Sequence, residues 1–163
     1  MGLELPGELV EALGWIGLDW PTADEEQLFR LGQQWLALAP QIQQVGADAG
    51  AAASAVWQGN SGPAVAAFQK YWTADGAPSS LNPAGDAAMV VGCGLIVYAA
   101  IILALKINFI VQLVVLTIEV IEAIATAVAT FGASLLEIPI FQQITRTVVE
   151  GLIQQVTMEI IGG

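Results

Sequence analysis

Histidine and cysteine, which many enzymes use for catalysis and metal binding, are nearly absent from this sequence. Its 163 residues contain no His and one Cys, so neither a Ser-His-Asp triad nor a zinc site of Cys and His ligands can be assembled. The 15 acidic residues leave carboxylate pairs available, but none is marked as an acid–base couple. We therefore expect no enzymatic activity, no catalytic residues, no metal site and no cofactor. Cys93 lies in an apolar run, where we expect a buried structural thiol.

The charge balance excludes a second class of function. The net charge is −11 and only four residues are basic: Arg30, Lys70, Lys106 and Arg146. Binding to nucleic acid depends on Lys and Arg that neutralise phosphates, so we expect no nucleic-acid partner. Anionic lipid headgroups are disfavoured for the same reason.

A Trp-x-Gly motif, Trp57-Gln58-Gly59, is the first candidate for recognition. Gly59 is suited to a left-handed cap at the end of one helix, and Trp57 to covering the end of the groove between two helices. Tyr71 and Asp75 are four residues apart, so they share one face of the helix that follows. These four residues form a candidate recognition motif. Packing and capping explain Trp57 and Gly59 equally well, and chance explains the spacing of Tyr71 and Asp75 equally well.

A stripe of polar residues is the second candidate. At about 100° per residue its seven members fall within about 80° of a helix circumference, which scattered polar residues would not do. The stripe predicts a long helix with one narrow wet edge. Its members are Asn108, Gln112, Glu119, Glu122, Thr126, Thr130 and Glu137.

A helical hairpin over residues 22–75 must position the Trp-x-Gly motif. Thr22 and Glu25 have the spacing of a capping box at its start. Apolar residues then recur with heptad spacing to Val56, which predicts one nearly parallel or antiparallel partner helix. We expect a kink near Pro40. The residues expected to pack the hairpin are Leu28, Leu31, Trp35, Leu38, Ile42, Phe68 and Trp72.

The remaining segments complete an all-α fold, a single helical domain over 1–163 in the form of an elongated helical bundle. Residues 1–21 are expected to be an irregular lead-in whose tryptophans pack back on the helices. Residues 76–82 carry a linker signature, and a very long apolar helix is expected over 83–138. Within it, residues 87–105 carry no charge. Pro139 is expected to start a C-terminal helix over 139–161.

The ordered set of motifs resembles a known family. Asp19-Trp20-Pro21, Trp35, Val56-Trp57-Gln58-Gly59 and Ala66-Ala67-Phe68-Gln69-Lys70-Tyr71-Trp72 resemble the WxG-type proteins of type VII secretion. More narrowly, they look like the actinobacterial branch at the N-terminus of modular, polymorphic toxins, which includes the mycobacterial outer-membrane channel-and-toxin protein. The resemblance covers nearly the whole chain.

The resemblance implies a non-catalytic export and docking domain, which a toxin domain usually follows. The implied partner is the type VII secretion machinery, and the implied location is outside the cell or in the cell envelope. The N-terminus has no basic region followed by an apolar one, so we expect no cleavable signal peptide. Tyr71 to Asp75 matches the Tyr-x-x-x-Asp/Glu pattern that accompanies WxG in type VII signals, although it follows the turn more closely than the family usually has it.

The uncharged stretch keeps a membrane alternative open. Nineteen residues without charge, 87–105, meet the length for a spanning helix, and in an oligomer the polar stripe would line a lumen. Missing basic flanks and a missing aromatic belt favour the soluble bundle. In that case a homo-oligomer or a partner helical protein is expected to cover the apolar helix.

Overall fold

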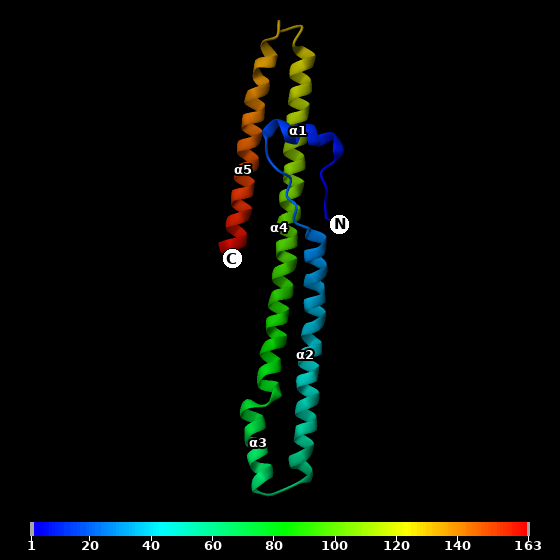
Figure 1. The fold of residues 1–163 in the computed structure, drawn as a ribbon, viewed down its shortest axis with the longest axis vertical. Coiled ribbons are helices and arrows are strands. Elements are labelled where there is room, and N and C mark those ends of the chain that lie inside the picture. Colours follow the sequence, from blue (N-terminus) through cyan, green and yellow to red (C-terminus); the bar gives the residue numbers. More distant parts are fainter. Residues whose placement is uncertain (1, 163) are drawn as a thin grey trace. The chain divides into compact units, whose positions relative to one another are not determined.

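The structure is a computed structural model that describes residues 2–162, and it is built from helices (Figure 1). No strand occurs among these residues, so the all-α prediction is confirmed. Five α-helices and two short 3-10 helices follow one another along the chain. They are η1 Gly7–Leu9, α1 Val10–Ile16, α2 Glu25–Gly59, α3 Pro63–Asp75, α4 Ala77–Thr126, η2 Ala133–Glu137 and α5 Ile138–Gly162.

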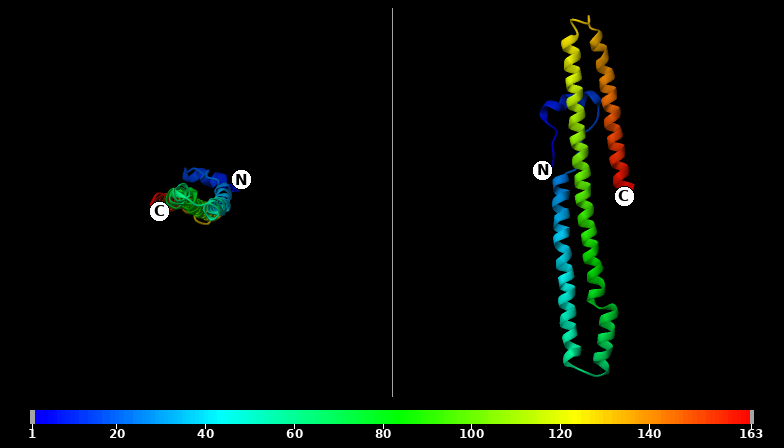
Figure 2. Two further views of the ribbon diagram at one scale, coloured as in Figure 1. Left: turned by 90° about the horizontal axis from the view of Figure 1, so that it is seen from below. Right: turned by 180° about the vertical axis from the view of Figure 1, so that it is seen from behind.

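The chain forms two compact units. Unit 1 contains Met1–Gln27 and Tyr98–Gly163, and unit 2 contains Leu28–Val97. In unit 2, most of α2 lies alongside α3 and the first part of α4 (Figures 1 and 2). In unit 1, the second part of α4 and α5 form an antiparallel pair, and the N-terminal segment crosses both (Figures 1 and 2).

The N-terminal lead-in is more ordered than the sequence predicts. Residues 10–16 form α1, which ends at Gly17 in the left-handed conformation (φ 64°). The start of α2 also differs, because Asp24 Oδ1 accepts the N–H of Gln27 at 2.9 Å and therefore caps the helix in place of Thr22. This frees Glu25 for another contact, described below.

The expected linker over 76–82 is helical apart from Gly76. This glycine separates α3 from α4, which begins at Ala77 and contains Pro83. A Cβ on Gly76 would lie 2.2 Å from the carbonyl oxygen of Trp72, so only glycine fits this sharp bend. Pro40 also lies within a continuous helix, and Cys93 is exposed rather than buried.

The long helix ends earlier than predicted, at Thr126 instead of residue 138. Phe131 (φ 54°) and Gly132 (φ 84°) are both left-handed, which stops the helix. The N–H of Gly132 donates to the carbonyl of Ala127 at 2.7 Å, as in a Schellman-type ending. The C-terminal helix is confirmed to within a residue at each end, over Ile138–Gly162.

In unit 2, small residues let α2 and α4 approach closely. The buried positions of α2 in this unit recur every seven residues, at Gly32, Ala39, Gly46 and Ala53. Gly32 lies against Gly92 of α4 and Ala39 against Gly85, and both α4 glycines are buried, as is Ala88 between them. We call these seven residues the small-residue seam. A Cβ on Gly32 would lie 2.8 Å from the oxygen of Gly92, so the two backbones are in direct contact.

Unit 1 has a larger apolar core. Phe109, Leu113 and Leu116 of α4 are fully buried, as is Val149 of α5. Leu9, Ala12 and Ile16 of the N-terminal segment complete the core, with Trp15 and Trp20 packed at its edge. The expectation that these tryptophans pack back on the helices is confirmed. The N-terminal segment, with its two short helices η1 and α1, thus packs against both α4 and α5.

Candidate functional site

The Trp-x-Gly motif lies where α2 reverses into α3. Trp57 packs against Phe68 at 5.9 Å between ring centroids, and Phe68 against Trp72 at 5.8 Å. All three rings are partly buried, and we call them the aromatic cluster. Such tilted aromatic pairs stabilise a turn beyond their buried area. The cluster therefore gives Trp57 a structural role, as the packing interpretation predicts.

Gly59 has no corresponding role in the fold. It is the last residue of α2, and its φ is not positive; Gly62 is the glycine of this turn with a left-handed φ, at 123°. The expectation that Gly59 supplies a left-handed cap is therefore wrong. A Cβ on Gly59 would meet no atom within 4 Å, so neither conformation nor packing requires glycine there.

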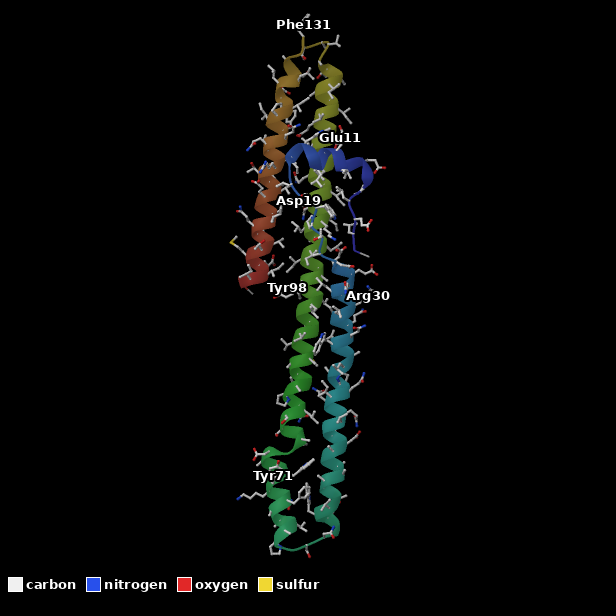
Figure 3. The ribbon with its side chains drawn as sticks, viewed as in Figure 1. Glu11, Asp19, Arg30, Tyr71, Tyr98 and Phe131 are labelled. Carbon is white, nitrogen blue, oxygen red and sulfur yellow. The ribbon has the colours of Figure 1, made fainter. Side chains whose placement is uncertain are left out.

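Tyr71 and Asp75 are displayed on α3. Tyr71 is 61% exposed and Asp75, the last residue of the helix, is also exposed. Figure 3 labels Tyr71 on α3 of the hairpin. Since the two side chains are one turn apart, a partner can contact both at once. The structure thus presents an open Gly59 and an exposed Tyr71–Asp75 pair within one hairpin.

The heptad residues of α2 do not close the hairpin. Leu31, Trp35 and Leu38 are 39%, 39% and 40% exposed, because the small-residue seam forms the contact with α4 instead. Leu28 and Ile42 are half-buried. The heptad stripe is therefore an apolar surface on the outside of unit 2, next to the seam.

The polar stripe is divided by the early end of α4. Asn108, Gln112, Glu119, Glu122 and Thr126 lie on the helix, whereas Thr130 and Glu137 follow it. Glu119, Glu122, Thr126 and Glu137 line one open pocket of about 360 Å³ with Ala123 and Phe141. Within residues 2–162, no group of three His, Cys, Asp or Glu side chains is placed to hold a metal ion.

A buried ion pair is the feature that the sequence did not predict. Lys106 Nζ lies 2.7 Å from Glu25 Oε2 and also donates to the carbonyl of Ala23 at 2.7 Å. The ring of Trp20 lies 5.9 Å from the same ammonium and packs edge-on against Phe109. The one sequence signal was Lys106 itself, a lone charge in a long apolar run.

The pKa of Glu25 reflects these contacts. Burial raises the pKa of its carboxyl, but the hydrogen bonds from the Leu3 N–H and from Lys106, together with the Lys106 charge, outweigh burial and hold the pKa below its ordinary value of 4.5. The Glu25 carboxyl is thus ionised at neutral pH. The ion pair fastens the start of α2 and the N-terminal segment to α4 within unit 1.

Much of α4 is apolar and exposed. Among the described residues, the segment Pro63–Thr126 is the one long and apolar enough to cross a membrane, with a mean hydropathy of 2.6 in its most apolar window. Only 28% of that window is buried, so α4 is not the enclosed core helix of a globular protein. Ile107, Val111, Ile118 and Ile121 are each about half exposed.

Comparison with known proteins identifies a family. No curated protein and no solved structure matches the chain. The family described as the WXG100 like domain matches residues 4–148, which is most of the sequence and includes the hairpin, the small-residue seam and most of the core of unit 1. The chain therefore belongs to the family of WXG100-like domains.

Proposed function

We propose that this chain is a non-catalytic export and docking domain that a type VII-like secretion system recognises through the hairpin. Membership in the WXG100-like family relates the chain to type VII secretion. The observation that carries the proposal is Gly59, which has open space where a Cβ would lie, so the fold does not need a glycine there. A glycine that the chain itself does not require allows the backbone of a partner to approach closely.

Tyr71 and Asp75 extend this recognition surface along α3. Both are exposed, and a partner contact uses an exposed aromatic ring and a carboxylate without disturbing the fold. Trp57 has a supporting role, since the aromatic cluster holds the turn that presents Gly59. In this proposal the chain is secreted or held in the cell envelope, and its natural context is the N-terminal side of a toxin domain.

The proposed partners include a second helical chain as well as the secretion machinery. Leu31, Trp35 and Leu38 keep heptad spacing over exposed surface, which is the pattern that a neighbouring helix covers. Either a second copy or a helical partner protein meets this requirement. Its binding would remove these exposed apolar side chains of α2 from water.

The proposal is tested by export of a Trp57→Ala, Gly59→Ala double variant from a bacterium with a type VII system. Export is expected to stop while circular dichroism of the purified variant shows unchanged helix content. Export at the level of the parent protein would reject the recognition role. Tyr71→Ala with Asp75→Asn provides a second variant, in which both changed side chains are exposed and the fold is expected to be unaffected.

A second candidate is an oligomeric membrane-inserting or channel-forming protein that uses α4. The low burial of its apolar window supports this candidate. In such an assembly Glu119 and Glu122 would face water. The exposed isoleucines of α4, Ile107, Ile118 and Ile121, would face lipid. Recovery of the full chain in the soluble fraction, in one oligomeric state and without detergent, would reject it; recovery only from membranes would reject the soluble export domain.

A further inference from the structure

The loop between α4 and α5 presents a second exposed surface, separate from the hairpin motif. We call residues 127–136 the tip loop; it ends the α4–α5 pair in unit 1 (Figures 1 and 3). Phe131 is 100% exposed, Val128 90% and Leu136 76%. No charged residue lies between Glu122 and Glu137. A solvated loop is normally polar, so this concentration of bare apolar side chains indicates a binding surface.

The tip loop has a defined shape and satisfies its own polar groups. Ser134 is buried, and its hydroxyl donates to the carbonyl of Ala123 at 2.7 Å. The backbone N–H of Ser134 donates to Thr130 Oγ1 at 3.3 Å, and the N–H of Gly132 donates to the carbonyl of Ala127. A segment that enters a weakly polar medium needs its backbone groups paired internally, and these bonds pair part of the tip loop in this way.

Phe131 is held outward at a cost. Its φ of 54° lies in the left-handed region, which bulky residues rarely adopt. The ring is fully exposed and adds nothing to the core of unit 1. Because such strain persists mainly where function uses it, an exposed and strained phenylalanine indicates a contact made with another surface.

Three carboxylates set how far the tip can enter an apolar medium. Glu119, Glu122 and Glu137 line the pocket just behind the tip loop. From Glu122 to Thr126 the helix rises about 6 Å, so the uncharged end is about one turn of helix plus the loop. This depth matches insertion to the boundary between headgroups and acyl chains, about 5–10 Å, and is too short for a span.

We propose that the tip loop inserts into the interface of a lipid bilayer, with Phe131 and Val128 among the acyl chains. The occupant is a bilayer with a neutral surface, because the carboxylates behind the tip and a net charge of −11 are repelled by anionic headgroups. The tip is a protruding loop of exposed side chains, which suits a deformable apolar layer.

The proposal is tested by flotation of the full chain with vesicles of phosphatidylcholine. The parent protein binds them, Phe131→Ser lowers the binding about tenfold, and Val90→Ser, which removes a side chain 72% exposed elsewhere on α4, binds like the parent. Vesicles containing phosphatidylglycerol bind the parent more weakly. Circular dichroism confirms that each variant is folded.

Depth is measured with an environment-sensitive dye on single cysteines in a Cys93→Ser background. Dye at Val128→Cys shifts to the blue on adding phosphatidylcholine vesicles, whereas dye at Ile118→Cys, about 12 Å back from the end of α4, does not. A parent protein that ignores these vesicles, equal binding by Phe131→Ser, stronger binding to anionic vesicles, or a blue shift at position 118 would each overturn the proposal.

Discussion

Lys106 and Glu25 form a buried ion pair that joins α4 to the start of α2, with 3% and 8% of their side chains exposed. The ammonium has two further neighbours, the carbonyl of Ala23 and the ring of Trp20. The pair thus anchors the residues from which the N-terminal segment turns back across α4. The core of unit 1 depends on this segment, because Leu9, Ala12 and Ile16 are part of it.

Replacing Lys106 by Met is expected to destabilise the protein strongly. The substitution leaves the Glu25 carboxylate buried without its cation, which costs about 3–5 kcal/mol in the free energy of unfolding. Urea unfolding followed by circular dichroism measures the loss. Arg146→Met is the matched control, since its ion pair with Glu150 is 47% and 42% exposed and is expected to contribute at most about 1 kcal/mol. Equal effects of the two substitutions would contradict a buried anchor.

The same pair predicts how stability depends on pH. The pKa of Glu25 is lowered in the folded protein, so its contribution is fully present above its unfolded value of 4.5 and is lost as the pH falls through the lower folded value. Below pH 4.5, the midpoint of thermal unfolding of the parent protein should fall more steeply than that of Glu25→Gln. Parallel curves for the two proteins would show that Glu25 does not titrate as described.

The small-residue seam predicts opposite effects at two nearby glycines of α4. A Cβ on Gly92 would lie 2.8 Å from Leu36 and 2.9 Å from the oxygen of Gly32, so Gly92→Ala forces α2 and α4 apart and costs about 1–3 kcal/mol. A Cβ on Gly94 meets nothing within 4 Å, so Gly94→Ala stabilises the helix by up to about 1 kcal/mol. Chemical denaturation of both variants decides the matter, and stabilisation by Gly92→Ala would contradict the close contact.

The sequence predicts the helical fold because its periodic signals are long and its breaks are marked. Pro139 identifies the start of α5, and the Trp57 turn identifies the hairpin. Gly132 is a signal for the end of a helix, but the polar stripe continues past it to Glu137 and predicts a longer helix. A stripe defined by angle alone does not detect the left-handed residues that stop a helix.

The interior contacts were harder to predict. Leu31 and Trp35 carry the strongest heptad signal in α2, yet the helix packs through Gly32 and Ala39 beside them. Hydrophobic periodicity favours large residues, whereas close packing of two long helices selects small ones. The partner of Lys106 was unpredictable for another reason, since the contact joins residues 81 positions apart.

The most direct test of the central claim, that Gly59 serves recognition and not folding, is export of the Gly59→Ala variant beside Gly94→Ala. Both glycines are helical and open, so both variants should unfold at the temperature of the parent protein or slightly above it. Secretion of Gly59→Ala into the culture medium, by a strain with a type VII system, should fall at least tenfold, whereas secretion of Gly94→Ala should not change. A tenfold loss corresponds to ~1.4 kcal/mol of binding free energy. Secretion of Gly59→Ala at the level of Gly94→Ala would contradict the claim.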